Sequence, residues 1–298
     1  MNITITGATG FIGRRLIERL ARAPHQIHAL SRRTAAKFGD TAVWISPWDP
    51  MAGEPGPESV ANADAIVHLA GEPVAQRWTP EAKIRIRESR VQGTRHLVQA
   101  LSTQSRRPAV LVCGSAIGIY GSRGDEILSE SSAAGSDYLA EVCQEWEKQA
   151  ALAESLGIRV VRIRTGIVLG KGGGALEKML PPFKAFVGGK VGSGKQWMSW
   201  IHLDDLVGII CHALENPMHG AFNGTAPNPV TNSAFTAELA RALGRPAVFP
   251  VPGFALRAMF GEMSEMLLGS QRALPRATEA AGYKFEYPEL GRALRSIV

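Results

Sequence analysis

The first thirteen residues of the chain constrain its fold more than any other stretch. Residues 2–6 have the sequence Asn-Ile-Thr-Ile-Thr, typical of a buried strand, and the turn Gly-Ala-Thr-Gly-Phe-Ile-Gly follows at once. The apolar residues of the next segment recur at the spacing of one helix face: Ile12, Leu16, Ile17 and Leu20. A strand, a glycine turn and a helix in this order are typical of a site for dinucleotide phosphates. An ordinary corner between a strand and a helix can also carry glycines, but the flanking elements and the N-terminal position favour the dinucleotide.

Each glycine of this turn has a separate physical role in binding a pyrophosphate. Gly7 allows the chain to turn sharply off the strand, where a side chain would clash. Gly10 has no Cβ, so the backbone can approach the phosphates, and Gly13 lets the helix pack tightly against the strand. The first helical N–H groups then face the phosphates from the positive end of the helix dipole. The predicted phosphate site consists of Gly7, Thr9, Gly10, Phe11, Ile12 and Gly13.

The first half of the chain alternates strand and helix patterns. Strand patterns occur at residues 26–30, 42–45, 65–69, 109–113 and 159–164, and helix patterns at 11–23, 80–101 and 137–156. This alternation predicts an α/β fold of the Rossmann type, a doubly wound parallel sheet with helices on both faces. With 298 residues, of which 45% are hydrophobic, the chain is long enough for one large core or for two unequal lobes.

The pattern changes after Leu169. The sequence Gly-Lys-Gly-Gly-Gly at residues 170–174 indicates a flexible hinge or a loop of close approach, and Pro and Gly are frequent beyond it. We therefore predict a dinucleotide-binding domain over residues 1–170 and a smaller C-terminal substrate lobe over residues 171–298. Residues 196–226 are expected to return to the first domain, with Trp200-Ile201 and Ala221-Phe222 rejoining the sheet.

A net charge of +6 raises the question of a polyanionic partner. The basic residues are scattered, and Glu81 and Glu88 interleave with the group between Lys83 and Arg95. A solvated helix face explains that group better than a nucleic-acid site, and a phosphorylated cofactor or an anionic substrate would use some of the remaining charge. No secretory signal precedes the first strand, and no apolar run is long enough to span a bilayer. We expect a small-molecule substrate, and neither nucleic acid nor membrane as a partner.

The chain has three widely spaced cysteines, Cys113, Cys143 and Cys211. Their spacing matches no metal site, so no metal is expected. An odd number without a disulfide framework is typical of a reducing compartment, which favours a cytoplasmic protein.

The end of the second strand indicates which dinucleotide binds. An acidic residue about twenty positions after the glycines would hold the 2′-hydroxyl of the adenosine ribose. This chain has Ser31-Arg32-Arg33 instead. An arginine accepts a 2′-phosphate through charge-assisted hydrogen bonds, so NADP is favoured over NAD, although two loop arginines can also be mere surface residues.

The fourth predicted strand ends in small residues. The sequence at its carboxyl end is Leu69-Ala70-Gly71-Glu72. Small residues at the carboxyl end of a strand let a cofactor lie across the sheet at its switch point, so these four residues are predicted to line the cofactor site. A plain exit from strand to loop is the alternative.

Several motifs together resemble the extended short-chain dehydrogenase/reductase family. They are residues 6–13, Leu69-Ala70-Gly71, Gly114-Ser115-Ala116 with Ile119-Tyr120-Gly121, and Trp200-Ile201-His202-Leu203-Asp204-Asp205. Residues 89–94, 164–170 and 192–202 resemble, more narrowly, its atypical NAD(P)-dependent epimerase-like subgroup, whose members are often labelled nucleotide-sugar epimerases. Residues 260–275 resemble the C-terminal domain of uncertain role that this subgroup carries. The resemblance covers essentially the whole chain.

The resemblance implies a catalytic set that this chain carries only in part. Members of the wider family use a Ser or Thr after the fifth strand, a Tyr, and a Lys four residues beyond that Tyr. Ser115 and Tyr138 match the first two, whereas the fourth residue after Tyr138 is Val142. Residues four apart share a helix face, so a lysine there would hold the nicotinamide ribose and lower the pKa of the tyrosine. Val142 can do neither, and Arg90 stands where many members have asparagine.

A polar and aromatic cluster beside glycines is the candidate substrate site. It consists of Lys195, Gln196, Trp197 and Trp200. The cluster would clamp an anionic or sugar-like substrate, although the tryptophans can equally be core anchors. His202 is more typical of a satisfied structural group than of a base, and Asp204-Asp205 are typical of the start of a helix.

These observations favour an NADP-binding oxidoreductase or epimerase that acts on a small, sugar-nucleotide-like substrate with a non-standard catalytic set. Ser115 would hydrogen-bond the reacting oxygen, and Tyr138 would donate or accept the proton. The alternative is a non-catalytic NADP(H)-responsive binding or sensor protein, which keeps the phosphate site and lacks the catalytic lysine.

Overall fold

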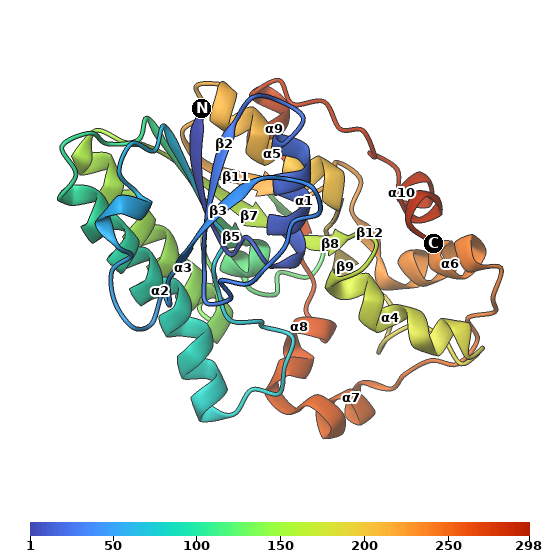
Figure 1. The fold of residues 1–298 in the computed structure, drawn as a ribbon. Helices are drawn as coiled ribbons and strands as arrows, with labels where there is room; N and C mark the ends of the chain where they lie inside the picture. Colours follow the sequence, from blue (N-terminus) through green and yellow to red (C-terminus); the bar gives the residue numbers. More distant parts are fainter.

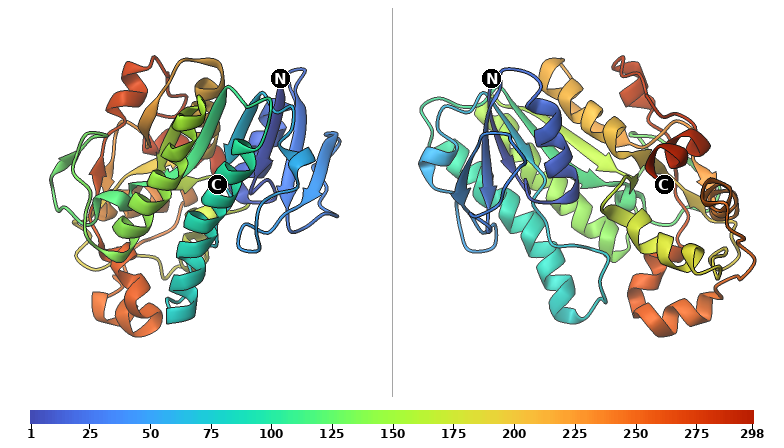
Figure 2. Two further views of the ribbon diagram at one scale, coloured as in Figure 1. Left: turned by 90° about the vertical axis from the view of Figure 1, so that its left-hand side faces the viewer. Right: turned by 45° about the vertical axis from the view of Figure 1, so that its right-hand side comes forward.

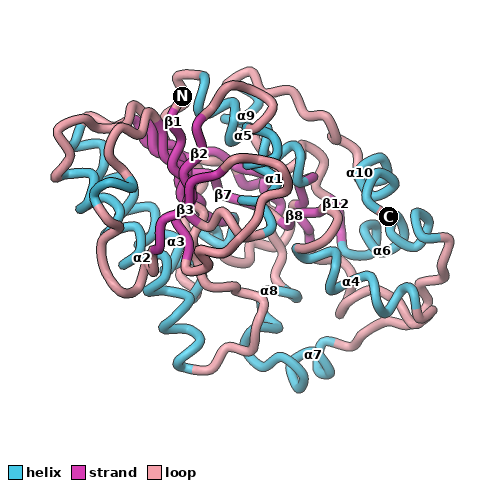
Figure 3. Tube along the Cα trace, in the orientation of Figure 1, coloured by secondary structure: helices cyan, strands magenta, loops and turns pink.

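A sheet of seven parallel strands forms the centre of the computed structural model, which describes all 298 residues (Figures 1 and 3). In spatial order the strands are β11 (Gly220–Gly224), β7 (Arg159–Thr165), β5 (Val110–Ala116), β4 (Ala65–His68), β1 (Asn2–Thr6), β2 (Gln26–Ser31) and β3 (Val43–Pro47). The chain starts at β1, winds outward to β3, and returns through β4 to the other edge. This order is that of a doubly wound sheet, so the predicted Rossmann-type α/β fold is confirmed.

Helices cover both faces of the sheet (Figures 1 and 2). One face packs against α1 (Phe11–Leu20) and α5 (Leu203–Glu215), and the other against α2 (Pro80–Ser102) and α3 (Tyr138–Ala151). Successive residues of a strand point to opposite faces, so Val112 of β5 joins the first core and Leu111 the second. Because both faces are apolar, the central strands are nearly continuous hydrophobic runs.

Capping residues account for the predicted helix starts. The Oγ1 atom of Thr79 accepts a hydrogen bond from the Ala82 N–H at the start of α2, and Asp137 accepts one from the Ala140 N–H at the start of α3. The end of α1 differs from the prediction, because the helix stops at Leu20 rather than near residue 23. Pro24 follows, and the residue before a proline is disfavoured in helical conformation.

The chain leaves the main sheet at Gly166. The next strand, β8 (Ile167–Leu169), pairs with β10 (Trp200–His202) in a separate two-stranded sheet. A Cβ atom on Gly166 would lie 2.3 Å from the Ser199 carbonyl oxygen, so the two segments can cross here only at a glycine. Trp200-Ile201 therefore lie in this small sheet instead of the main one, whereas Ala221-Phe222 lie in β11 at the edge of the main sheet.

The rest of the C-terminal half builds a smaller lobe with an apolar core of its own. Its side-by-side helices are α4 (Gly174–Lys184), α6 (Asn232–Leu243) and α10 (Leu290–Ile297) (Figure 1). The other helices of this half are α7 (Gly253–Phe260), α8 (Ser264–Leu268) and α9 (Arg276–Ala280). Two further strand pairs are β9 (Trp197–Met198) with β12 (Val230–Thr231), and β6 (Ile127–Leu128) with β13 (Arg272–Ala273). None of the helices combines the length and the apolar composition that crossing a bilayer requires.

One buried carboxylate fastens the C-terminal segment to the sheet. Asp205, in the first turn of α5, has no exposed surface. It accepts hydrogen bonds from the Tyr283 hydroxyl at 3.0 Å and from the backbone N–H groups of Glu286 at 2.7 Å and Tyr287 at 2.9 Å. A single side chain of the sheet domain thus holds residues 283–287 in place.

We expect Asp205→Ala to lower the free energy of unfolding by about 3 kcal/mol, because three donors lose a charged acceptor. Urea denaturation followed by circular dichroism measures the loss, and limited proteolysis should show new cleavage near residues 282–289. Asp40→Ala is the control, because Asp40 is exposed and its side chain makes no hydrogen bond or ion pair. Equal stability of the two variants would contradict this role of Asp205.

Candidate functional site

The glycine turn brings the end of β1 against the end of β4. Gly7 has φ +69°, in the left-handed region that favours glycine, and a Cβ atom on it would lie 2.6 Å from the Leu69 carbonyl carbon. A Cβ atom on Gly13 would lie 2.4 Å from the Gly7 carbonyl oxygen. Both positions therefore require glycine for the fold itself, and they fix where the two strands meet at the switch point of the sheet.

Gly10 and the start of α1 form an open, electropositive surface. Gly10 is exposed at the N-cap of the helix, and a Cβ atom on it would meet only the Gly7 carbonyl oxygen, at 3.1 Å. The N–H groups of Phe11, Ile12 and Gly13 have no acceptor within the chain, and the first turn carries no acidic residue. Unpaired N–H groups, a bare glycine and the positive end of the dipole fit the pyrophosphate of a dinucleotide.

The glycines at 170–174 pack around the aromatic ring of Phe11. Cβ atoms on Gly170, Gly173 and Gly174 would lie 2.9, 2.5 and 2.8 Å from atoms of that ring. The loop at residues 170–174 therefore packs closely against the glycine turn at residues 7–13. Thr9 and Ile12 are partly buried in the same turn. The Phe11 side chain is occupied by this packing, so what Phe11 offers a ligand is its backbone N–H.

The end of β2 presents two unpaired arginines. The Oγ atom of Ser31 accepts a hydrogen bond from the Arg33 N–H at 2.9 Å, which shapes the turn. Arg32 and Arg33 are exposed, and neither guanidinium makes a hydrogen bond or ion pair within the chain. The strand end thus carries free positive charge and no carboxylate.

A chain of buried hydrogen bonds fixes the end of β4. The Thr6 Oγ1 atom accepts hydrogen bonds from the N–H groups of Leu69 at 3.2 Å and Ala70 at 3.1 Å, and it lies 2.7 Å from Nδ1 of His68. The other ring nitrogen of His68 lies 3.0 Å from Oγ1 of Thr94. Burial, reinforced by the charge of Arg90, lowers the pKa of His68 to about 3. His68 is therefore neutral and structural.

Gly71 and Glu72 follow directly after this strand end. Gly71 is exposed, and the Glu72 N–H donates to the Ser89 hydroxyl at 2.9 Å. The Glu72 carboxylate accepts from Gln76 at 3.1 Å and lies 3.8 Å from Nε of Arg85. Its charge is thus partly balanced by its neighbours.

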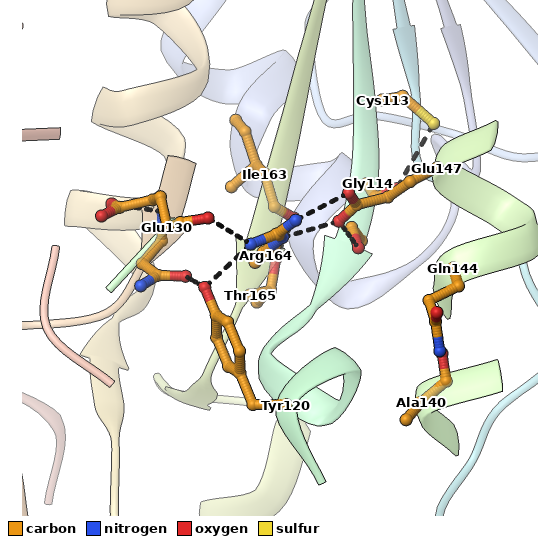
Figure 4. A network of polar contacts seen from close by, with 12 residues as sticks. Cys113, Gly114, Tyr120, Glu130, Ala140, Gln144, Glu147, Ile163, Arg164 and Thr165 are labelled. Atoms are coloured by element: carbon orange, nitrogen blue, oxygen red, sulfur yellow. Dashed lines mark hydrogen bonds and ion pairs between the residues drawn. The ribbon is translucent and has the colours of Figure 1, made fainter. Parts of the chain in front are cut away.

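A buried charged network at the end of β5 joins Glu147, Arg164 and Tyr120 (Figure 4), and Ser115 belongs to it. Its hydroxyl donates to Glu147 at 2.7 Å, and Glu147 forms two hydrogen bonds with Arg164, at 2.8 and 3.0 Å. Arg164 also donates to the Tyr120 hydroxyl at 3.0 Å, and Tyr120 donates to Asn223 at 2.7 Å. Burial opposes the charge of Arg164, but the hydrogen bonds and charges of Glu147 and Tyr120 together outweigh burial and raise its pKa. The Ser115 hydroxyl therefore donates its hydrogen to a carboxylate, so toward a ligand it can act only as a hydrogen-bond acceptor.

Tyr138 lies at the start of α3 and points toward α2. Its hydroxyl donates to the Lys83 carbonyl oxygen at 2.6 Å, and its ring packs edge-on against Trp78 with centroids 5.4 Å apart. Burial raises the pKa of Tyr138, and the nearby charges of Arg90 and Arg87 only partly offset that rise. Val142 is buried and supplies no cation. No hydrogen bond joins Tyr138 to Ser115.

The four predicted substrate residues separate into two pairs. Gln196 is buried and donates to the Val191 carbonyl oxygen at 3.0 Å, and Trp200 is completely buried with its indole N–H bonded to the Asn228 carbonyl oxygen. These two side chains pack the core of the lobe and present no surface to a ligand. Lys195 is exposed, and Trp197 is partly exposed, with its indole N–H donating to Asp125 at 2.8 Å.

His202 and the acidic pair after it are structural. Asp204 and Asp205 lie in the first turn of α5, as their sequence position predicts, and the capping residue is His202, whose Nδ1 atom accepts a hydrogen bond from the Asp204 N–H. The imidazole also stacks on Tyr287, with centroids 3.9 Å apart. Burial lowers the pKa of His202 despite the neighbouring carboxylates.

Sequence reasoning missed Glu147, and a signal for it was present. Ala140, Cys143, Glu147 and Ala150 share the buried face of α3, so Glu147 places a charge on an apolar helix face. Arg164 similarly interrupts the apolar strand β7. A buried acid and a buried base in neighbouring elements indicate an ion pair, because neither is tolerated alone.

We expect Glu147→Ala to lower the free energy of unfolding by about 3–5 kcal/mol, because it leaves the buried Arg164 without its partner. The control is Glu145→Ala on the same helix, whose partly exposed carboxylate pairs with Arg87 and contributes less than about 1 kcal/mol. Urea denaturation of both variants gives the comparison. Similar losses would show that the network is not a structural centre.

Two family models match nearly the whole chain. The model of the NAD dependent epimerase/dehydratase family matches residues 3–224. The model of a domain of unknown function, DUF1731, matches residues 251–297.

The chain is also similar to individual known proteins. It is 44% identical over 302 residues to the epimerase family protein SDR39U1 homolog, chloroplastic, of Arabidopsis thaliana, covering 100% of this chain and 87% of that protein. The crystal structure of the human epimerase family protein SDR39U1 with NADPH superimposes with a TM-score of 0.88 at 35% identity, covering 100% of this chain and 99% of that one. A nucleoside-diphosphate sugar epimerase from Corynebacterium glutamicum superimposes with a TM-score of 0.78 at 37% identity, covering 99% of this chain and 57% of that one.

Proposed function

Because the chain belongs to the NAD dependent epimerase/dehydratase family, we propose that it binds NADP(H) and performs oxidoreductase or epimerase chemistry on a small substrate. The observation that carries the proposal is the open start of α1 beside two unpaired arginines at the end of β2. The human relative crystallised with NADPH, 35% identical over the whole chain, supports the phosphorylated cofactor.

The cofactor would lie across the carboxyl ends of β1, β2 and β4. The N–H groups at Phe11, Ile12 and Gly13 would hold the pyrophosphate, and Arg32 and Arg33 would hold the 2′-phosphate. The small residues 69–71 would face the nicotinamide half. A bound nicotinamide would supply the hydride donor or acceptor.

The chain's own residues would position the substrate and move the proton. Tyr138 would donate a proton to the reacting oxygen, or accept one from it, after its hydroxyl leaves the Lys83 carbonyl oxygen. Ser115 would donate to the same oxygen only if its hydroxyl turned away from Glu147. Lys195 and Trp197 would contact the substrate at the edge of the smaller lobe. The similar Corynebacterium protein, described as a nucleoside-diphosphate sugar epimerase, supports a sugar-nucleotide substrate.

A second function, that of an NADP(H)-responsive binding protein without turnover, is favoured by a specific observation. Both candidate hydroxyls donate to acceptors within the protein, and position 142 holds a buried valine instead of a lysine. The phosphate site does not depend on these residues. Cofactor binding without turnover across a panel of alcohols, ketones and nucleotide sugars would favour the binding protein. Oxidation of NADPH by any of the carbonyl compounds would favour the enzyme.

The three cysteines support a reducing compartment such as the cytoplasm. All three are free thiols, and none forms a disulfide. Burial raises the pKa of Cys143 to about 12, so this thiol is unreactive at neutral pH and acts in packing.

We expect NADPH to bind at least about tenfold more tightly than NADH, because charge-assisted hydrogen bonds to the 2′-phosphate contribute roughly 1.5–3 kcal/mol. The double variant Arg32→Ala, Arg33→Ala should lose this preference and keep its affinity for NADH. Isothermal titration with both cofactors measures the four affinities. Equal affinities in the unaltered protein would refute the preference.

Gly10→Val is the control for the location of the cofactor. A Cβ atom at this exposed position would meet only the Gly7 carbonyl oxygen, at 3.1 Å, and the branched side chain would fill the surface beside the helix start, so we expect the variant to fold. The Gly10→Val variant should bind neither NADPH nor NADH. Retained NADPH binding in the folded variant would place the cofactor elsewhere.

The raised pKa of Tyr138 predicts the pH dependence of a working enzyme. An ordinary tyrosine has a pKa near ~10, and burial raises this one further, so the hydroxyl is protonated at neutral pH. Carbonyl reduction, which consumes the tyrosine proton, should be independent of pH between about 6 and 8 and fall at alkaline pH. Alcohol oxidation, which needs the tyrosinate, should rise toward alkaline pH. Rates measured in both directions from pH 6 to 10.5 test this.

Tyr138→Phe should abolish both reactions and leave NADPH affinity nearly unchanged. Tyr287→Phe, which alters a tyrosine near the C-terminus, is the matched control. Full activity of Tyr138→Phe on a true substrate would show that the proton comes from another group.

A further inference from the structure

Arg90 is a charged residue at the proposed nicotinamide end of the site that the proposed chemistry does not use. It extends from α2 to the end of β4, where a Cβ atom on Gly71 would lie 3.0 Å from its Cζ atom and 3.2 Å from Nη2. The guanidinium carbon also lies 5.2 Å from the centre of the Trp146 ring. The charge therefore sits beside the small residues over which the cofactor is proposed to lie.

Three of the five N–H donors of this guanidinium are unused. Nη1 donates to the backbone carbonyl oxygens of Glu72 at 2.9 Å and Ile86 at 3.0 Å. Nε and Nη2 have no acceptor in the chain, and neither atom is fully enclosed by protein. These two nitrogens form one edge of the planar guanidinium fork, which matches the two oxygens of a carboxylate or a phosphate.

No carboxylate is in direct contact with Arg90, and Glu72 is the only one whose charge acts on it from a distance. No carboxylate forms an ion pair with it, because the Glu72 side chain is turned to Gln76 and Arg85. His68, Cys143 and Tyr138 also lie near Arg90 and are neutral near pH 7, because burial lowers the pKa of His68 to about 3, raises that of Cys143 to about 12 and raises that of Tyr138 above its usual value. Burial also lowers the pKa of Arg90 itself. An unpaired cation in such a place is costly unless a ligand balances it.

From this arrangement we propose that Arg90 binds an anionic oxygen group of the substrate, a carboxylate or a phosphate, through Nε and Nη2. The inference rests on the proposed function, because it places the anionic group of the substrate beside the nicotinamide end of NADP(H). It narrows the substrate class to anions. It also assigns a binding role to the position at which the chain differs from the asparagine of the family that it resembles.

Three sugar probes test this directly: glucuronate, glucose 1-phosphate and glucose. They share one ring and differ in carrying a carboxylate, a phosphate or no charge. Isothermal titrations of the whole protein, with and without saturating NADP⁺, should show at least one anion binding about tenfold or more tightly than glucose. The anion that is preferred identifies the chemical source of the charge. Preference for neither anion would overturn the proposal.

Variants locate the effect at this side chain. Arg90→Met should remove the preference for the anion, and Arg90→Lys, which keeps the charge without the fork, should retain a weaker preference. Arg95→Met is the control, because Arg95 is an exposed arginine on the same helix. An unchanged anion preference in Arg90→Met would refute the role of this residue. NADPH affinity should be unaffected in all three variants, so failure of this inference is distinct from failure of the proposed function.

A stability measurement separates ligand binding from a purely structural role. If Arg90 serves only to anchor the Glu72 and Ile86 carbonyl oxygens, Arg90→Met should melt several degrees lower than the unaltered protein. If the Arg90 charge is balanced only when a ligand binds, Arg90→Met should leave the melting temperature of the ligand-free protein unchanged or raise it. A lowered melting temperature together with a retained anion preference would establish the structural role alone.

Discussion

The close approach of the glycine turn to the end of β4 is the contact on which the site depends. Backbone meets backbone there, because a side chain at Gly7 or Gly13 would overlap main-chain atoms of Leu69, Gly7 or Ala8. The contact brings the two central strands together at the point where the winding of the sheet reverses, and it turns the unpaired N–H groups of α1 toward the same edge. The glycine loop after β8 then closes on Phe11 from the other lobe. The proposed phosphate site is thus a consequence of packing at positions without side chains.

The C-terminal domain is coupled to this site through the start of α5. Asp204 pairs with Arg15 of α1 at 2.5 Å, while the adjacent Asp205 holds residues 283–287. Elsewhere in the same segment, Met263 packs with Trp78 and Ile86, and Glu262 pairs with Lys83 at 2.7 Å. The C-terminal segment therefore contacts the start of α2 through residues 262–263 and the start of α5 through residues 283–287.

The fold was predictable because its determinants are local, whereas the polar interior was not. Periodicity, caps such as Thr79 and Asp137, and the glycine turn specify the elements of the sheet within a few residues each. The partner of Ser115 is 32 residues away in sequence, and the partner of Glu147 is 17 residues away on another element. Such pairs depend on which helix face meets which strand, and a single sequence does not specify that. The burial of Trp200 was ambiguous for a related reason, since tryptophan is common both in cores and at ligand sites.

The distribution of free hydrogen-bonding groups separates the two proposed functions. The hydroxyls expected to do chemistry are engaged: Ser115 donates to a carboxylate and Tyr138 to a carbonyl. The groups expected to bind are free: the N–H groups of α1, both arginines after β2, and one edge of Arg90. A protein that only senses NADP(H) would need the N–H groups of α1 and the two arginines after β2. It would gain nothing from an unpaired cation beside Gly71, because that cation lowers the stability of the fold. The free edge of Arg90 is therefore the feature that agrees better with a second ligand beside the proposed cofactor than with cofactor binding alone.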